Sequence, residues 1–200
     1  ILKEKEIGRH MSARINILSA DETAIKIIED HFQLPRFIAT VLVARGVDTI
    51  EKATSFLNAS IDKDWHNPYE IEGMEAVVSQ LEQAVKDHKR ILVFGDFDLD
   101  GISATTIMAR GLREVGGDVV PFIPLRFEEG YGLTEAAIAR ALTYEPDVVI
   151  TVDNGISAKE EAHFLTDAGV SLIVTDHHEP SGLVPQNVAL VDPKCSDSPS

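Results

Sequence analysis

Three aspartates within five residues, Asp96, Asp98 and Asp100, come directly before Gly101 in the stretch RILVFGDFDLDGISATTIMARGL. An apolar run precedes them and a helix-forming segment follows, so the predicted order is strand, acidic loop and helix. In such a unit the loop at the carboxyl end of the strand is where ligands bind. Carboxylates packed this closely repel one another by roughly 3–4 kcal/mol per pair at an effective dielectric of 20. The spacing therefore indicates a bound cation, and hard divalent ions prefer such oxygen ligands.

Two further apolar runs also end on side chains that can bind metals. PDVVITVD ends on Asp153, and VSLIVTDHHEP contains Asp176, His177 and His178. Apolar strands alternating with amphipathic helices predict an α/β domain whose mostly parallel sheet carries helices on both faces, with all carboxyl ends at one edge. We therefore expect the three clusters to converge, and carboxylates with imidazole suit Mn²⁺, Mg²⁺ or Zn²⁺. This many carboxylates favours two Mn²⁺ or Mg²⁺ ions, an arrangement typical of phosphoryl hydrolases.

Each cluster also has another interpretation. DxDxDG begins an EF-hand loop, but a strand precedes it here and position 12 would be Ile107 instead of Glu. An aspartyl nucleophile of the haloacid-dehalogenase type would fit Asp98–Gly101, but Ile102 is atypical there and the histidine pair would have no role. Asp153 alone would more often be a turn residue, and an isolated histidine pair would more often be solvated. Their common position at strand ends favours the metal site.

DFDLDG, VDNG and DHH, in this order and spacing, resemble motifs I to III of the DHH phosphoesterase superfamily. PLRFEEGYGLT, residues 124–134, resembles a segment typical of the RecJ branch, the single-strand-specific exonucleases. ALVDPK, residues 189–194, is similar to the segment that follows motif III in that branch, and residues 45–61 are similar to its helical lead-in. The resemblance covers about residues 30–195 and implies a DHH-type domain.

The resemblance implies a metal-binding role for five residues. Asp98 and Asp100 match the motif I carboxylates that hold metal, and Asp96 matches the first aspartate of that motif, as ligand or close support. Asp153 matches the bridging carboxylate of motif II, and His177 matches the metal ligand of motif III. The implied cofactor is Mn²⁺ or Mg²⁺, with two ions in one site.

Five more residues match positions near the metals or the substrate. Asp176 would orient the neighbouring histidine ligand, and His178 would face the scissile phosphate as a hydrogen-bond or proton donor. Arg126 would clamp a phosphate, because guanidinium meets phosphate oxygens bidentately; its alternative is a surface ion pair with a nearby glutamate. Gly130 and Gly132 would let the backbone approach the substrate closely.

The activity implied by the resemblance is hydrolysis of single-stranded DNA from the 5′ end toward the 3′ end, in DNA repair and recombination. Single-stranded-DNA-binding protein and a helicase are implied as partners only by the family. Two alternatives stay open: a DHH oligoribonuclease or cyclic-dinucleotide phosphodiesterase, and a non-catalytic DHH scaffold. The first would usually begin motif I with a histidine-containing loop and lack RFEEGYGL, and the second would have lost metal ligands that are present here.

Composition limits the remaining possibilities. A net charge of −15 over 200 residues argues against a general nucleic-acid-binding surface, because phosphate contacts need Lys and Arg. Part of this acidity is the predicted metal site, where two divalent ions would restore about +4. The single cysteine, Cys195, excludes an internal disulfide and fits a reducing cytoplasm. No apolar run approaches 18 residues and no secretory signal is apparent, so we expect a cytoplasmic protein without a membrane segment.

The sequence predicts three parts. Residues 1–12 resemble a tag or a disordered extension, residues 13–70 form a helical segment and linker, and residues 71–200 form the DHH-type domain. Helices are expected over residues 20–32, with Asp21 as N-cap, over 35–45, and from an Asp48 cap to Leu57. A further helix, residues 74–88, leads into the first strand. The fourth motif of the superfamily is absent, so the domain is expected to be incomplete at its carboxyl end.

Overall fold

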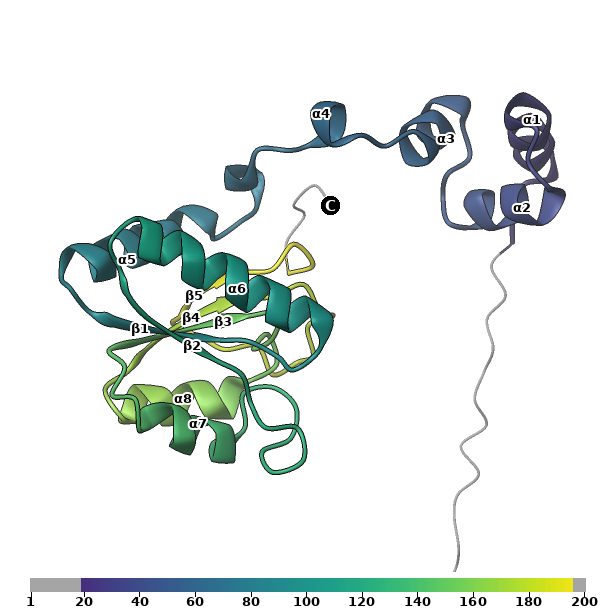
Figure 1. Cartoon of the computed structure of the whole chain (residues 1–200). Coiled ribbons are helices and arrows are strands. Elements are labelled where there is room, and N and C mark those ends of the chain that lie inside the picture. Colours follow the sequence, from purple (N-terminus) through teal and green to yellow (C-terminus); the bar gives the residue numbers. More distant parts are fainter. Residues whose placement is uncertain (1–18, 196–200) are drawn as a thin grey trace, which may run out of the picture. The chain divides into compact units, whose positions relative to one another are not determined.

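The computed structural model describes residues 19–195, which fall into two compact units divided between Trp65 and His66 (Figure 1). The prediction for residues 1–12 lies outside the described residues. No helix of residues 19–195 is long and apolar enough to cross a membrane.

The first unit is helical. Its helices are α1 (Glu22–Phe32), α2 (Arg36–Ala44), α3 (Ile50–Leu57) and α4 (Ile61–Asp64). Asp21 caps α1 as predicted, by accepting a hydrogen bond from the backbone N–H of Thr23. Thr49, and not Asp48, caps α3, because the Asp48 carboxylate is instead paired with Lys52 at 2.7 Å. Apolar side chains from α1, α2 and α3 form the small core of this unit.

The second unit is a doubly wound α/β domain, as the sequence predicts. Its helices are η1 (Pro68–Glu70), α5 (Met74–Lys86), α6 (Leu99–Glu114), α7 (Glu135–Leu142) and α8 (Lys159–Asp167). Its strands are β1 (Arg90–Phe94), β2 (Asp118–Phe122), β3 (Val148–Val152), β4 (Ser171–Thr175) and β5 (Ala189–Val191). The strand order is β2-β1-β3-β4-β5 and every pair is parallel. The strand order reverses between β1 and β3, which is where ligands bind in open α/β sheets.

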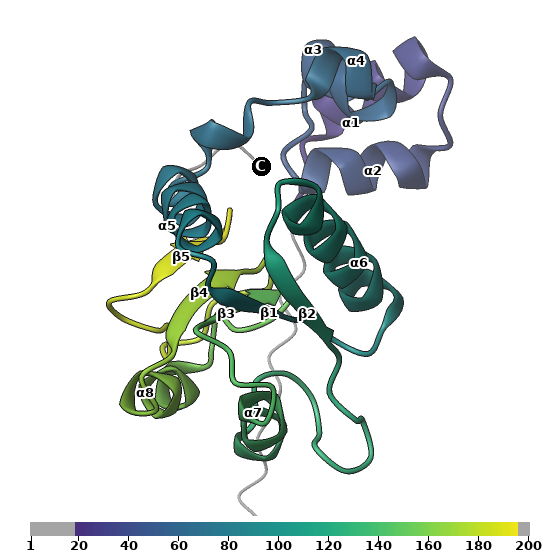
Figure 2. The ribbon, with the colours of Figure 1, turned by 60° about the vertical axis from the view of Figure 1, so that its left-hand side comes forward.

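Helices cover both faces of this sheet. Helices α5 and α6 lie on one face and α7 and α8 on the other, and Figure 2 shows the same layers from a second direction. Alternate residues of one strand serve the two layers: Ile91 and Val93 belong to the α5–α6 core, whereas Leu92 and Phe94 belong to the α7–α8 core. A strand buried on both faces has no polar positions, which explains the continuous apolar runs.

Candidate metal centre

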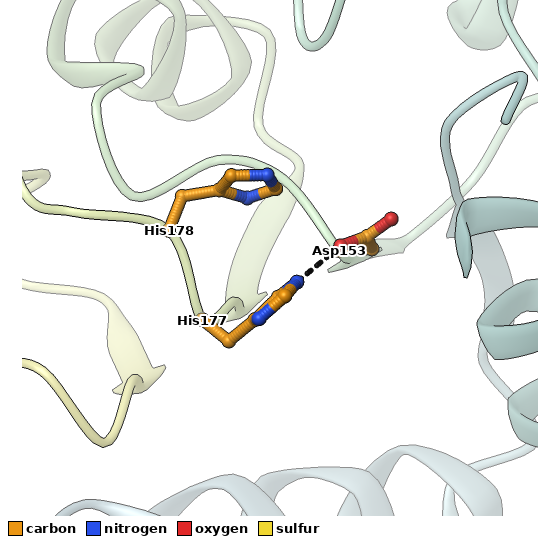
Figure 3. A group of neighbouring side chains, drawn as sticks. All are labelled: Asp153, His177 and His178. Atoms are coloured by element: carbon orange, nitrogen blue, oxygen red, sulfur yellow. Dashed lines mark hydrogen bonds and ion pairs between the residues drawn. The ribbon is translucent and has the colours of Figure 1, made fainter. Parts of the chain in front are cut away.

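Ligating side chains converge at the carboxyl edge of the sheet. Because β3 lies between β1 and β4, the residues that follow these strands are neighbours although they span more than 80 residues of sequence. Asp153, His177 and His178 each offer one donor atom, and these atoms lie within 4.8 Å of one another. His177 Nε2 is 2.8 Å from Asp153 Oδ1 (Figure 3). The structure thus brings motifs II and III together as the sequence predicts.

Asp153 has an unusual backbone conformation. Its φ of 64° is left-handed, which few residues other than glycine adopt, although aspartate tolerates it better than most. Its backbone N–H donates to the carbonyl of Thr175 and so extends the β3–β4 ladder by one residue. Burial raises the pKa of the Asp153 carboxyl, and the charges of Asp100 and Asp98 raise it further, against a lowering by the hydrogen bond with His177. Strain of this kind collects at functional sites.

Asp96 is a buried carboxylate whose oxygens have no hydrogen-bond partner of normal geometry among the described residues. Its relative exposure is 0%. Burial raises the pKa of this carboxyl, the charges of Asp98 and Asp153 add to the effect, and the backbone N–H of Phe97 offsets part of it. Buried charges are normally paired or coordinate metal. These unpaired oxygens beside two other aspartates therefore fit a site for a divalent cation.

The other two motif I aspartates lie at the start of α6. Asp98 Oδ1 accepts a hydrogen bond from the backbone N–H of Gly101 at 2.9 Å, so this residue is the N-cap of the helix. Asp100 is exposed, and its Oδ2 lies 3.8 Å from His177 Nε2. A Cβ added at Gly101 would lie 2.5 Å from the backbone nitrogen of Asp96. Glycine at this position lets α6 begin directly against the buried aspartate.

Asp176 is a buried hydrogen-bond hub. Its Oδ1 accepts from His178 Nδ1 at 2.7 Å and from the backbone N–H groups of His177 and His178, and its Oδ2 accepts from the backbone N–H of Ile156 at 2.9 Å. The sequence analysis expected Asp176 to orient the ring of His177, but in the structure Asp176 orients the ring of His178. The hydrogen bond that His178 donates to Asp176 raises the pKa of His178, because the carboxylate stabilises the imidazolium.

The segment 124–134 reaches the same edge. The guanidinium carbon of Arg126 lies 4.9 Å from the ring centre of Phe97, and Phe97 meets the ring of Tyr131 edge-on. The Tyr131 hydroxyl is 3.5 Å from His178 Nε2. These contacts connect Arg126 to the histidine pair through two aromatic rings, and they leave its guanidinium exposed.

The alternative interpretation of Arg126, a surface ion pair with a nearby glutamate, is not seen among the described residues. Glu129 is paired with Arg140 instead, at 2.8 Å between Oε2 and Nη2. Gly130 and Gly132 have φ values of 85° and 72°, which only glycine adopts readily. Added Cβ atoms there would meet little or nothing within 4 Å, so the two glycines shape the loop and are not squeezed by neighbours.

Two residues of this edge were missed by the sequence analysis. Tyr131 is part of the RFEEGYGL segment but was given no role, and only the fold places it beside His178. Asp192 follows β5 and is 1% exposed; its Oδ1 accepts from the backbone N–H of Lys194, and its Oδ2 has no partner among the described residues. The strand before it has three residues, too few to show a pattern.

The fold and this edge define the class of the second unit: a doubly wound α/β domain with carboxylates and imidazoles at the switch point of its sheet. The model of the DHH family, N-terminal domain, matches residues 90–200, more than half of the chain. The chain therefore belongs to the DHH family, which confirms the resemblance seen in its motifs.

Curated relatives and solved structures agree with this assignment. The single-stranded-DNA-specific exonuclease RecJ of Bacillus subtilis is 36% identical over 181 residues, 90% of this chain and 23% of that protein. RecJ of Thermus thermophilus is 42% identical over 120 residues, 60% of this chain and 18% of that protein. A crystal structure of exonuclease RecJ bound to manganese is 40% identical with a TM-score of 0.60, and covers 65% of this chain and 33% of its own. The chain spans about a quarter of the length of the curated relatives that it matches.

Proposed function

We propose that the protein carrying this chain is a Mn²⁺- or Mg²⁺-dependent exonuclease that hydrolyses single-stranded DNA from the 5′ end, in DNA repair and recombination. The observation that carries the proposal is the convergence of Asp153, His177 and His178 at the switch point of the sheet, beside the buried and unpaired carboxylate of Asp96. The RecJ exonucleases among the relatives support the substrate and the reaction.

The donor set fits hard divalent cations. Asp100, Asp153 and His177 would hold the metal, and Asp96 and Asp98 would complete the oxygen-rich set. When bound, such ions lower the pKa of water and neutralise charge on phosphate oxygens. Burial raises the pKa of Asp96 and of Asp153, and repulsion among the aspartates raises it further; bound cations would relieve this repulsion.

The remaining residues of the chain would act on the phosphate. Asp176 accepts from Nδ1 of His178, so in the protonated ring the Nε2–H is available as a hydrogen-bond or proton donor to the phosphate or to the leaving oxygen. The raised pKa of His178 keeps more of the ring protonated near neutral pH. Arg126, exposed above Phe97, would bind the phosphate of the incoming strand bidentately.

We also place the reaction in the cytoplasm, where the single Cys195 stays reduced, with single-stranded-DNA-binding protein and a helicase as partners. The net charge of −15 supports a role for such partners, because a chain with this charge attracts the phosphates of DNA poorly and partner proteins would deliver the strand to it.

The test uses the intact protein with Mn²⁺ and single-stranded DNA labelled at one end or the other, beside a duplex and a dinucleotide. Early release of labelled mononucleotide from the 5′ end is expected, and Asp153→Ala should abolish it, whereas Asp62→Ala, in the first unit, should not. Cleavage of the dinucleotide alone would overturn the substrate. If Mn²⁺ raises the melting temperature but nothing is cut, the non-catalytic scaffold replaces the exonuclease. Ions at 100 times their dissociation constant should stabilise the fold by about 2.7 kcal/mol.

A further inference from the structure

The residue that follows Asp153 is buried and hydrogen-bonded to the ends of two strands. Asn154 is 2% exposed, and its side-chain nitrogen donates to the carbonyl of Val152 at 3.0 Å and to that of Phe94 at 3.4 Å. Val152 ends β3 and Phe94 ends β1, the two strands between which the strand order reverses. The two N–H donors of one carboxamide thus serve two carbonyl oxygens at the switch point of the sheet.

The hydrogen bond from Asn154 to Val152 encloses the backbone of Asp153. It joins the residue after Asp153 to the residue before it, and the residue between them has a left-handed φ of 64°. Gly155 continues the turn with a φ of 107°, and a Cβ added there would lie 2.7 Å from Oγ1 of Thr151. The turn therefore packs tightly against β3, and the Asn154 side chain stabilises the conformation in which Asp153 is held.

The hydrogen bond to Phe94 joins this turn, residues 153–156, to the strand that leads into motif I. Two backbone hydrogen bonds of the turn, from the N–H groups of Asp153 and Ile156, go to the last residue of β4 and to the residue after it. The ladder between β1 and β3 has its last pair at Phe94, before the turn begins. Among residues 19–195, the hydrogen bond from Asn154 is the one that connects the turn to β1.

We propose that Asn154 is a positioning residue of the metal centre, which fixes the Asp153 carboxylate relative to Asp96 across the switch point. Carboxylates from two strands form one site only if their separation is constant, and the backbone ladder that would set this separation has already ended. An aspartate at position 154 could not do the same, because its carboxylate would face two carbonyl oxygens without a proton to donate. This role rests on the proposed function, because it takes the two aspartates to be ligands of divalent ions.

Calorimetric titration of the intact, metal-free protein with Mn²⁺ tests this role. Asn154→Ala removes both hydrogen bonds and should raise the Mn²⁺ dissociation constant about tenfold, the lower end of the usual effect of losing a group that orients a metal ligand. The control is Val149→Ala, in the buried middle of β3, which should lower the melting temperature and leave the dissociation constant unchanged. At saturating Mn²⁺, Asn154→Ala should lower kcat and leave KM for single-stranded DNA unchanged, because it displaces Asp153 and no group proposed to hold the strand.

Asn154→Ser provides a second variant, which decides the question if the alanine variant does not fold. Its hydroxyl is one shorter donor and can serve one carbonyl but not both, so its Mn²⁺ dissociation constant should lie above that of the unaltered protein and below that of Asn154→Ala.

Two results would overturn the positioning role and leave the exonuclease standing. The first is an unchanged Mn²⁺ dissociation constant in both Asn154 variants. The second is an equal weakening in Val149→Ala, because the effect would then come from a general loosening of the sheet. An unaltered protein that binds no Mn²⁺ would overturn the metal centre and this role together. An unaltered protein that binds Mn²⁺ but cuts nothing would overturn the exonuclease alone, and the titration would still decide the role of Asn154.

Discussion

Glu129 fixes the loop that carries Arg126 and Tyr131, so its substitution by Gln should affect stability and activity together. The carboxylate accepts hydrogen bonds from both Nε and Nη2 of Arg140 and from the backbone N–H of Leu125, at 2.7 Å for the last. The same arginine donates to the carbonyl of Ile123 at 2.8 Å. The pair therefore ties the beginning of the loop to α7.

The magnitude follows from these contacts. The Glu129 side chain is 8% exposed and that of Arg140 is 32% exposed. Gln keeps one acceptor and loses the charge, so about two charge-assisted hydrogen bonds weaken, each worth about 1.5–3 kcal/mol when buried. Water can replace part of this at the exposed side of Arg140, so we expect a loss of about 2–3 kcal/mol in the free energy of unfolding. For a chain of this size that lowers the melting temperature by roughly 5–10 °C.

The pH dependence has a definite sign. The hydrogen bond from Arg140 lowers the pKa of Glu129 in the folded state, so the stabilisation is complete above the carboxyl's unfolded pKa and is lost as the pH falls through the lowered folded value. The difference between the two proteins should therefore shrink below about pH 4.5, near the unfolded pKa of glutamate.

Denaturant unfolding at several pH values measures this difference. The control is Glu128→Gln, an exposed neighbour, which should unfold like the original protein. A Glu129→Gln protein within 0.5 kcal/mol of the original at pH 7, or a difference that grows in acid, would refute the reasoning. Exonuclease assays should show a raised KM, because the displaced loop carries the residue proposed to bind phosphate.

Three further predictions concern substitutions at Gly101, Asp96 and Asp176. Gly101→Ala should destabilise the protein by more than about 1 kcal/mol, because its Cβ would lie 2.5 Å from the backbone nitrogen of Asp96. Gly111→Ala, in the same helix, has free space around its Cβ and should stabilise the protein by about 0.5–1 kcal/mol. Unfolding curves that reverse this order would contradict the packing. Asp96→Asn should raise the melting temperature of the metal-free protein by a few degrees, because it removes a buried charge, and it should abolish cleavage. A lower melting temperature without metal would show that the Asp96 carboxylate is not an unfavourable buried charge. Asp176→Asn should lower the pKa of His178, followed by NMR titration of the ring; an unchanged titration would show that this carboxylate does not control it.

The elements that could be predicted best from the sequence are those with a long, uninterrupted run of apolar residues. Strands β1, β3 and β4 each contain mostly apolar, buried residues, and an acidic residue follows each strand within two positions. Strand β2 escaped notice because Pro121 interrupts it, which is tolerated at the sheet edge where no neighbour needs its missing N–H. Strand β5 is too short to show alternation.

The partners of the site residues were harder to predict than their positions. Parallel topology alone brings Asp153 beside His177. The hydrogen bond between Asp176 and the His178 ring depends on the side-chain rotamers of both residues. The pairing of Glu129 with Arg140, and not with Arg126, depends on how α7 packs against the loop. Local spacing carries no information on either choice.

The position of β3 between β1 and β4 has a consequence for folding. The ligands come from three strands separated by connections of more than 15 residues, and β3 must be paired on both sides before they meet. Such non-local pairings form late and slowly, because closing the intervening chain is entropically unfavourable. A partly folded chain thus has no complete site, and a metal ion binds only the finished sheet. Occupancy of the site would then favour the last pairing step, so the cofactor would act as a check on the completeness of the fold.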